Sequence, residues 1–263
     1  MTEPKIDSTI SHSARIWNYW LGGKDNYPVD REMGDKILSY VPELVRSARA
    51  DRYFLSRAVR YLVQEQGIRQ FLDIGTGLPT VDNTHEVAQR IAPECRIVYV
   101  DNDPLVLVHA RALLASSPEG ACDYIDADLR EPDQIVEKAA ATLDFTKPIA
   151  IMMLGIMNFI VDADQAQTIL GHILGAVPSG SYLSISHPTT EFDAEPAAVA
   201  LEFWNSSGSA QMCLRSRAEL LRFFEGTELV EPGVVSCPRW RPDLAEPGEI
   251  VDVMHFCGVA RKP

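Results

Sequence analysis

The sequence predicts a doubly wound α/β fold, in which helices cover both faces of a mostly parallel sheet. Three observations support this prediction. From residue 70 onward short apolar runs alternate with helical stretches, a glycine turn follows the first run, and several runs end in a carboxylate. Because crossovers between parallel strands are almost always right-handed, such alternation places helices on both faces of the sheet.

Five apolar runs are expected as parallel strands, and two later runs as a terminal antiparallel pair, because no clear helix separates those two. The parallel strands are expected at Gln70–Ile74, Arg96–Val100, Cys122–Ile125, Ile149–Leu154 and Ser181–Ser186. The helices between them are expected at 82–91, 104–115, 131–142 and 162–176. Helical patterns at 196–204 and 217–224 precede the terminal pair, which is expected at Leu229–Val235 and Val251–Ala260.

The first 69 residues are expected to form an N-terminal helical cap on a core of residues 70–263. Ser11–Trp20 is typical of a short helix that stops at Gly22-Gly23, and Pro42 opens a long amphipathic pattern. The aromatic side chains around the glycine pair allow two interpretations. The segment either closes over a ligand as a lid, or stays in place as a cap packed on the sheet.

Composition narrows the function classes. The net charge is −13, and residues 1–70 sum to +2 while the rest carries −15. A body this acidic repels phosphate backbones, so nucleic-acid binding is disfavoured. The five cysteines are scattered and never in C-x-x-C spacing, which indicates neither a disulfide framework nor a zinc site. The sequence shows no apolar signal core and no run of membrane-spanning length, which favours a cytoplasmic protein without a membrane partner.

The strongest signal lies in residues 71–80, where an apolar strand ends in Asp73 and the turn Gly75-Thr76-Gly77 follows. Glycines allow positive φ and let a ligand lie against bare backbone. Ligands of open α/β sheets bind at the carboxyl ends of the strands, and this is the first such end. The turn therefore predicts a ligand site.

Two further strands lead to carboxylates. Asp101 ends the second strand, where a carboxylate can accept both hydroxyls of a ribose, and Asn102 follows it. The third strand runs through Asp126 into Ala127-Asp128-Leu129, and an acid at this tip is expected to accept a hydrogen bond from an adenine amino group. Acids at the tips of three successive strands predict a nucleoside site.

These motifs resemble class I S-adenosylmethionine-dependent methyltransferases, which carry D-x-G-x-G, an acid that ends the second strand, and A-D-L after the third. The chain also resembles a bacterial family first described as a domain of unknown function and now called S-adenosyl methyltransferase. The segments that carry this second resemblance are Ala14–Tyr27, Asp73–Thr80, Glu231–Gly233 and Trp240–Pro242. The resemblance implies a class I fold and S-adenosylmethionine as the cofactor, but it implies no particular acceptor.

Cofactor contacts are expected from the strand tips and from the opening segment. Arg15 or Lys24 would pair with the donor's carboxylate. The expected cofactor-binding residues are Asp73, Gly75, Thr76, Gly77, Asp101, Asn102, Asp128, Leu129, Leu154, Arg15, Tyr19 and Gly23.

Residues 152–159 are expected to form the wall of the acceptor site, and they are apolar and rich in methionine. Such a wall suits a small, partly apolar acceptor, and Asn158 is the polar group expected to face inward. If a hydroxyl acceptor must lose its proton, His187 after the fifth strand is the candidate base, whereas His255 is expected as a core histidine. No metal-ligand spacing occurs among the Asp and His residues.

The function expected is methyl transfer to a small-molecule acceptor. The alternative is a non-catalytic S-adenosylmethionine-binding regulatory protein, because the sequence contains no recognisable catalytic base motif. A nicotinamide-dependent oxidoreductase is disfavoured, since Thr80 stands where G-x-G-x-x-G needs its third glycine and Pro79 lacks a backbone N–H. A polyamine-type aminopropyl transferase shares the fold but needs an acidic groove beyond the nucleoside acids.

Overall fold

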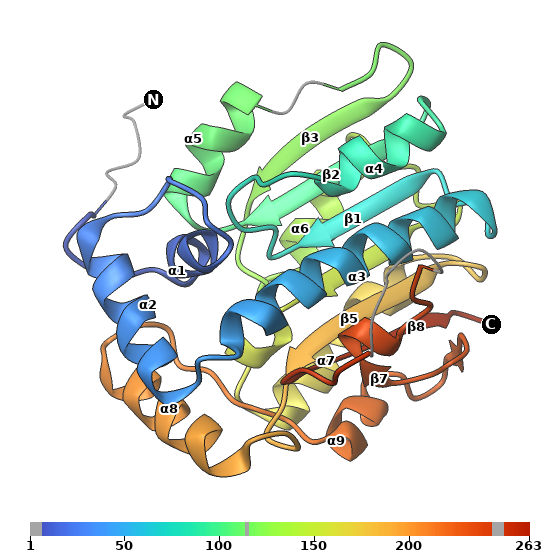
Figure 1. Cartoon of the computed structure of the whole chain (residues 1–263). Helices are drawn as coiled ribbons and strands as arrows, with labels where there is room; N and C mark the ends of the chain where they lie inside the picture. The colour runs from blue at the N-terminus through green and yellow to red at the C-terminus, as the bar shows by residue number, and fades with distance from the viewer. Residues whose placement is uncertain (1–6, 114–115, 244–249) are drawn as a thin grey trace.

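A computed structural model describes residues 7–113, 116–243 and 250–263 of the chain. Its centre is a sheet in the order β3-β2-β1-β4-β5-β8, with the short strands β6 and β7 both beside β8 (Figure 1). The first five strands run parallel, and β8 is antiparallel to β5. The strands are β1 (Gln70–Ile74), β2 (Arg96–Asp101), β3 (Ala121–Asp126), β4 (Ala150–Leu154), β5 (Tyr182–Pro188), β6 (Glu228–Leu229), β7 (Val235–Ser236) and β8 (His255–Arg261).

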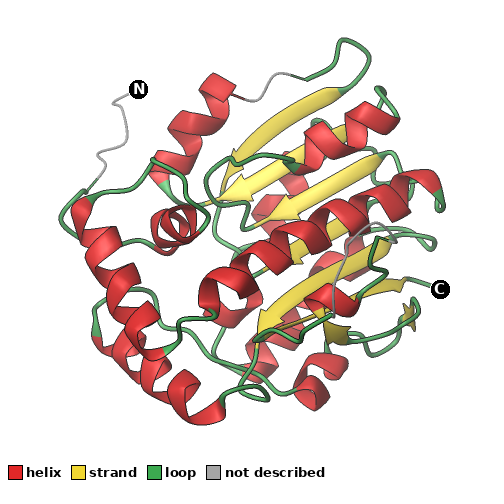
Figure 2. Ribbon diagram, in the orientation of Figure 1, coloured by secondary structure: helices red, strands yellow, loops and turns green. Residues whose placement is uncertain are grey.

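Helices lie on both faces of the sheet, which confirms the predicted fold class (Figure 2). One apolar cluster joins α3 and α4 to one face, and another joins α6, α7 and α9 to the other. The helices are α1 (Ser13–Trp20), α2 (Pro28–Tyr40), α3 (Leu44–Gln64), α4 (Thr84–Ile91), α5 (Pro104–Leu113), α6 (Pro132–Ala139), α7 (Ala163–Ala176), α8 (Ala194–Ser206) and α9 (Arg217–Arg222), with 3₁₀ turns η1 (Met157–Phe159) and η2 (Cys237–Arg239).

The terminal antiparallel arrangement is confirmed, but its first run is broken. The expected strand 229–235 forms two separate two-residue strands, because Pro232 lacks a backbone donor and Gly233 turns the chain at a φ of +81°. The second run begins as a strand at His255 rather than at residue 251. Residues 114–115, at the end of the expected helix 104–115, lie outside the described residues.

The opening segment contains a helix that the sequence analysis did not resolve. Pro28 begins α2 at the first helical position, and the Asp30 carboxylate accepts the backbone N–H of Tyr27 at the start of the helix. One apolar cluster joins α1, α2 and the start of α3 to α8 and Met254, whereas the rest of α3 packs on the sheet. The division of the chain at residue 69 stays a prediction.

The direction of the strands positions the site. The carboxyl ends of the parallel strands meet at one edge of the sheet, and α1 and α2 lie beside that edge (Figure 1). Because β8 is antiparallel, it brings its first residue, not its last, to the same edge, where His255 pairs with Pro188. Carboxyl ends of parallel strands and the start of β8 therefore converge under the N-terminal helices.

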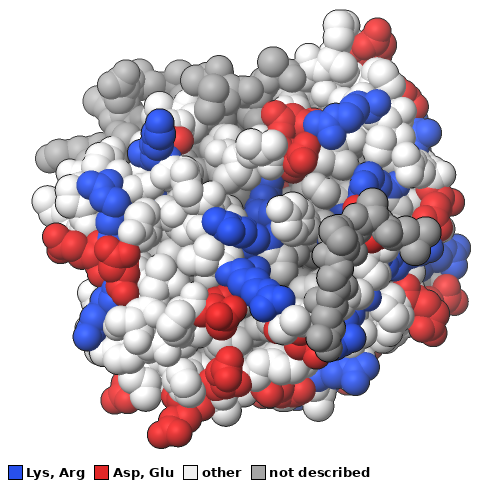
Figure 3. Space-filling view, in the orientation of Figure 1, with Lys and Arg blue, Asp and Glu red and all other residues white. Residues whose placement is uncertain are grey.

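The surface shown in Figure 3 carries acidic and basic side chains interspersed over its described part. Across residues 7–113, 116–243 and 250–263, no helix is long and apolar enough to cross a membrane. The same residues contain no group of three or more His, Cys, Asp or Glu side chains that could hold a metal ion.

Candidate active site

A cavity of about 310 Å³ opens at the carboxyl edge of the sheet and extends beneath α1. This volume is in the range of small-molecule sites. The strand tips form its floor, and α1, α2, α3 and α8 form its walls. The residues from the strand tips are Asp73, Gly75, Thr76, Gly77, Asp101, Asn102, Asp128, Leu129 and Leu154, so nine of the twelve expected cofactor residues lie on one cavity.

The glycine turn is held by the neighbouring strand. Gly75 donates to the carbonyl of Val100 at 2.8 Å, and its φ is +77°. A Cβ on Gly75 would overlap Ile156 in the loop after β4, so only glycine allows these two loops to meet. Gly77 also has a positive φ, of +66°, but a Cβ there would meet no atom within 4 Å. The backbone at Gly77 therefore lies open toward the cavity.

Asp73 is a buried carboxylate at the tip of β1. Thr84 donates its hydroxyl to Asp73 Oδ2 at 2.6 Å. Burial raises the pKa of Asp73 to about 6, although the Thr84 hydrogen bond and the charge of Arg52 oppose that rise. A buried acid with so few compensating contacts attracts a positively charged group.

Asp101 links the first two strand tips. Its Oδ2 accepts the N–H of Gly77 at 2.8 Å, and its Oδ1 accepts the N–H of Asp103 at 2.9 Å. Burial raises the pKa of Asp101, and these two N–H groups oppose the rise. Each carboxylate oxygen keeps a further lone pair, so the side chain can still accept two hydroxyls.

The tip of β3 contributes Asp128 rather than Asp126. Asp126 ends the strand and is exposed outside the cavity. Asp128 lies on the cavity, where Asn102 Nδ2 donates to its Oδ2 at 3.1 Å and the N–H of Arg130 donates to its Oδ1 at 2.8 Å. These contacts fix the carboxylate beside the second strand tip.

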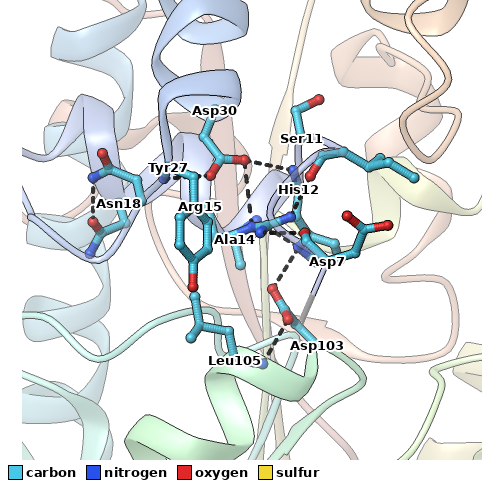
Figure 4. Close-up of polar contacts among 12 residues, drawn as sticks. Asp7, Ser11, His12, Ala14, Arg15, Asn18, Tyr27, Asp30, Asp103 and Leu105 are labelled. Carbon is cyan, nitrogen blue, oxygen red and sulfur yellow. Dashed lines mark hydrogen bonds and ion pairs between the residues drawn. The ribbon is translucent and has the colours of Figure 1, made fainter. Parts of the chain in front are cut away.

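A polar network fastens the N-terminal segment over these tips (Figure 4). Asp30 accepts the backbone N–H groups of His12 and Tyr27 at 2.9 and 2.8 Å, which joins the start of α1 to the start of α2. His12 Nδ1 lies 2.9 Å from Asp103 Oδ2, two residues beyond Asp101. The network connects the cap directly to the second strand tip.

Arg15 and Tyr19 do not lie on the cavity, which corrects the expected contacts. The guanidinium of buried Arg15 donates to the carbonyls of Asp7 and Ile10 and lies 3.5 Å from Asp30. Tyr19 donates its hydroxyl to Asp35 at 2.6 Å. The side of α1 that faces the cavity carries Ser13, Ala14, Trp17, Asn18 and Trp20 instead. Aromatic residues occur on every side of this helix, so its orientation could not be read from the sequence.

Gly23 also lies outside the cavity, and it packs against the side chain of Asn18. We expect Gly23→Ala to lower the free energy of unfolding by about 1–3 kcal/mol, because its Cβ would overlap the Asn18 side chain. That side chain accepts hydrogen bonds from Asp25 and Asn26, so it cannot move freely. Chemical denaturation measures the loss. The matched control is Gly171→Ala in α7, whose Cβ meets no atom within 4 Å and should raise stability slightly; equal effects would contradict the prediction.

His187 is not placed to act as the base. It is buried near Phe223, on the face of the sheet opposite the one that α3 covers, and it does not line the cavity. Its Nδ1 donates to the carbonyl of Pro188 and its Nε2 accepts from Arg215, both at 2.8 Å. Burial lowers the pKa of His187 to about 3. His187 faces away from the cavity because neighbouring residues along β5 point to opposite faces of the sheet.

Three cavity residues were missed or given another role, and one of them is Asp51 of α3. Arg52 of α3 lines the cavity, and it donates to the carbonyls of Val81 and Asp82 at 3.2 Å. The many arginines of α3 gave no signal that distinguishes it. His255 was expected in the core, but it lines the cavity because β8 begins at the carboxyl edge. Asn158 faces the cavity, as expected.

The wall beyond the strand tips is apolar and aromatic. It includes Trp204, whereas Phe203 packs against Tyr40 outside the cavity. The methionines of the expected Met-rich wall are buried in the core, and that segment contributes Ile156 and Phe159 instead. The apolar wall residues are Trp17, Trp20, Leu21, Ile37, Val41, Leu44, Phe159, Ala197, Ala200, Leu201, Trp204, Met212, Leu214 and Met254.

The sheet with its antiparallel β8, the glycine turn and the strand-tip acids define a class I methyltransferase. A solved S-adenosylmethionine-dependent methyltransferase from Anabaena variabilis shares the fold, with a TM-score of 0.52 and 11% identity over 100% of this chain and 98% of that one. The chain belongs to the S-adenosyl methyltransferase family, whose family model matches residues 1–263.

Two solved structures are much more similar. A DUF574 family protein from Streptomyces avermitilis has a TM-score of 0.94 and 46% identity, over 98% of this chain and 100% of that chain. A putative methyltransferase from Thermobifida fusca has a TM-score of 0.89 and 38% identity, over 97% of this chain and 96% of that chain. No curated protein matches the sequence. The protein is an S-adenosylmethionine-dependent methyltransferase.

Proposed function

We propose that the protein transfers the methyl group of S-adenosylmethionine to a small, largely apolar molecule enclosed under α1, α2 and α8. The observation that carries the proposal is the continuity of one cavity, which runs from the glycine turn and its acids to a wall of aromatic and aliphatic side chains. Enclosure keeps water away from the activated methyl group, which limits competing hydrolysis. A cavity of about 310 Å³ is in the range of small-molecule sites, which favours a small acceptor.

The residues present fit S-adenosylmethionine by their chemistry. The donor carries hydroxyls, an ammonium group and a positively charged sulfur, and three carboxylates line the strand tips. In this proposal Asp101 holds the ribose hydroxyls, Asp128 the adenine amino group and Asp73 the ammonium group. Arg52 is the cation beside Asp73, so it takes the place first expected for Arg15 and holds the donor's carboxylate.

Catalysis then depends on alignment and exclusion of water. The cofactor supplies an activated methyl group that passes to the acceptor by an in-line displacement. The walls from α1 and α8 hold the acceptor in line, and such positioning can account for much of the rate.

All five cysteines are free thiols, which supports our inference that the protein works in a reducing compartment such as the cytoplasm.

We expect S-adenosylhomocysteine to raise the melting temperature and to release or absorb heat in a calorimetric titration, because a ligand selective for the native state stabilises it. NAD is the control and should do neither, since the glycine turn lacks the dinucleotide pattern. A saturating titration without either response would contradict the proposed binding site.

Turnover is tested with the radiolabelled methyl donor and an extract of the source cell, separated afterwards by size. Relative to extract without the protein, new label in small molecules other than the donor supports the proposal, whereas new label only on protein or nucleic acid contradicts it. Donor binding without any labelled product would favour the non-catalytic regulatory alternative.

A further inference from the structure

The cavity contains buried polar atoms that no described residue satisfies. Both ring nitrogens of His255, Oδ1 of Asp51 and Oδ1 of Asn158 lack a hydrogen-bond partner within residues 7–113, 116–243 and 250–263. All three side chains line the cavity, and each residue is at most 4% exposed. Buried polar groups without partners are unfavourable, so they mark places where a bound molecule supplies the partner.

His255 and Asp51 are brought together by two independent elements. His255 begins β8 at the carboxyl edge, on the face of the sheet that α3 covers. Asp51 lies in α3, one turn after Ser47, whose hydroxyl oxygen accepts the N–H of Met254 at 3.2 Å. That hydrogen bond fixes α3 against the residue that precedes His255. The imidazole also meets the Trp17 ring edge-on, with centroids 5.8 Å apart.

Burial favours the neutral form of His255. Burial lowers its pKa, and the negative charge of Asp51 and the nearby Met254 backbone oppose that decrease, although the Met254 contact does not meet hydrogen-bond geometry. His187 is the other titratable group near it, and burial keeps that ring neutral as well. A neutral imidazole with two free nitrogens can accept a proton, and the nearby carboxylate stabilises the imidazolium that results.

We propose that His255 is the general base for a phenolic acceptor and that Asp51 stabilises its protonated form. The inference rests on the proposed function. The phenol O–H bond breaks and its proton goes to an imidazole nitrogen of His255. The phenolic oxygen bonds to the methyl carbon, the carbon–sulfur bond breaks with its electron pair kept by sulfur, and the imidazolium later releases the proton to solvent. The products are an aryl methyl ether and S-adenosylhomocysteine.

The chemistry of the cavity selects a phenol over other acceptors. A phenol has a pKa near 10, within reach of a histidine base, whereas an aliphatic hydroxyl resembles water, with a pKa near 16. A carboxylic acid is already ionised at pH 7, so it needs no base. The ring of a phenol fits the wall of Trp17, Trp204 and Phe159, which offers aromatic faces and edges.

Two phenols of different acidity separate a base from a residue that only supports the structure. 4-Methylphenol is protonated at pH 7.5, whereas pentafluorophenol is already ionised there. We expect His255→Gln to lower kcat/KM for 4-methylphenol by at least about 100-fold but to change it only a few-fold for pentafluorophenol. Asp51→Asn should show the same selectivity to a smaller extent. His172→Gln, on α7 away from the cavity, is the matched control and should change neither.

Ionisation of a bound phenol gives a readout without turnover. In the complex with S-adenosylhomocysteine, bound 4-nitrophenol should ionise at a lower pH in the wild type than in His255→Gln, as its absorbance reports. Four results would each overturn the inference. In His255→Gln, kcat/KM could fall equally for both phenols or for neither, or the ionisation of bound 4-nitrophenol could be unchanged. The wild type could also fail to methylate 4-methylphenol. In all these cases binding of S-adenosylhomocysteine stays intact; its absence would instead remove the proposed function.

Discussion

Asp101→Ala is expected to weaken the binding of S-adenosylhomocysteine by about 2–3 kcal/mol, because two buried ribose hydroxyls lose a charged acceptor. The same carboxylate holds the N–H groups of Gly77 and Asp103, so its removal also loosens the glycine turn. Calorimetric titration of the folded variant measures the loss.

Two variants separate these contributions. Asp101→Asn keeps an oxygen acceptor without the charge and should lose less affinity. Asp126→Ala is the matched control, because Asp126 pairs with Asp101 in the sheet register yet lies exposed outside the cavity. If Asp101→Ala binds as tightly as the control, then Asp101 does not hold the ribose.

Asp73→Asn is expected to stabilise the protein at pH 8 by up to about 3 kcal/mol while it weakens donor binding. The pKa of Asp73 is about 6 in the folded chain, against about 3.9 in an unfolded one, so the folded state binds more protons between these values. Its ionisation therefore destabilises the fold above pH 6. Thr84 can still donate to the amide oxygen of the variant. Denaturation at pH 8 and pH 4 should show a difference between variant and wild type that shrinks toward pH 4.

The same titration predicts proton release on donor binding. A cationic group beside Asp73 lowers the pKa of its carboxyl, so binding near pH 6 should release a proton. Calorimetry of S-adenosylhomocysteine in two buffers of different ionisation enthalpy detects that proton, and Asp73→Asn should abolish the difference. A variant less stable than the wild type at pH 8, with proton release unchanged, would refute the role given to Asp73.

The sheet and its strand-tip residues were predictable because the signals are local. Alternating apolar runs identify the strands, and the glycines and acids stand directly after them, so proximity in sequence already implies proximity in space. The nine cavity residues at strand tips needed no knowledge of long-range packing.

The other features of the site depend on how helices are rotated and on which face each strand residue points to. No local sequence signal gives these orientations. Ser13–Trp20 is apolar enough on several sides that the rotation of α1, and hence the exclusion of Arg15 and Tyr19, follows only from its packing against α2 and α8. His187 and His255 both belong to strands of the same sheet. The parity of each residue along its strand, together with the strand direction, decides which one reaches the cavity.

The roof of the cavity has a consequence for biosynthesis. Trp17 and Trp20 leave the ribosome first, yet they pack against Trp204 and Met254, and Trp17 meets His255, all of which are translated near the end of the chain. A polypeptide that lacks α8 and β8 lacks residues that close the cavity. Ligand binding in this protein is therefore a property of the finished chain.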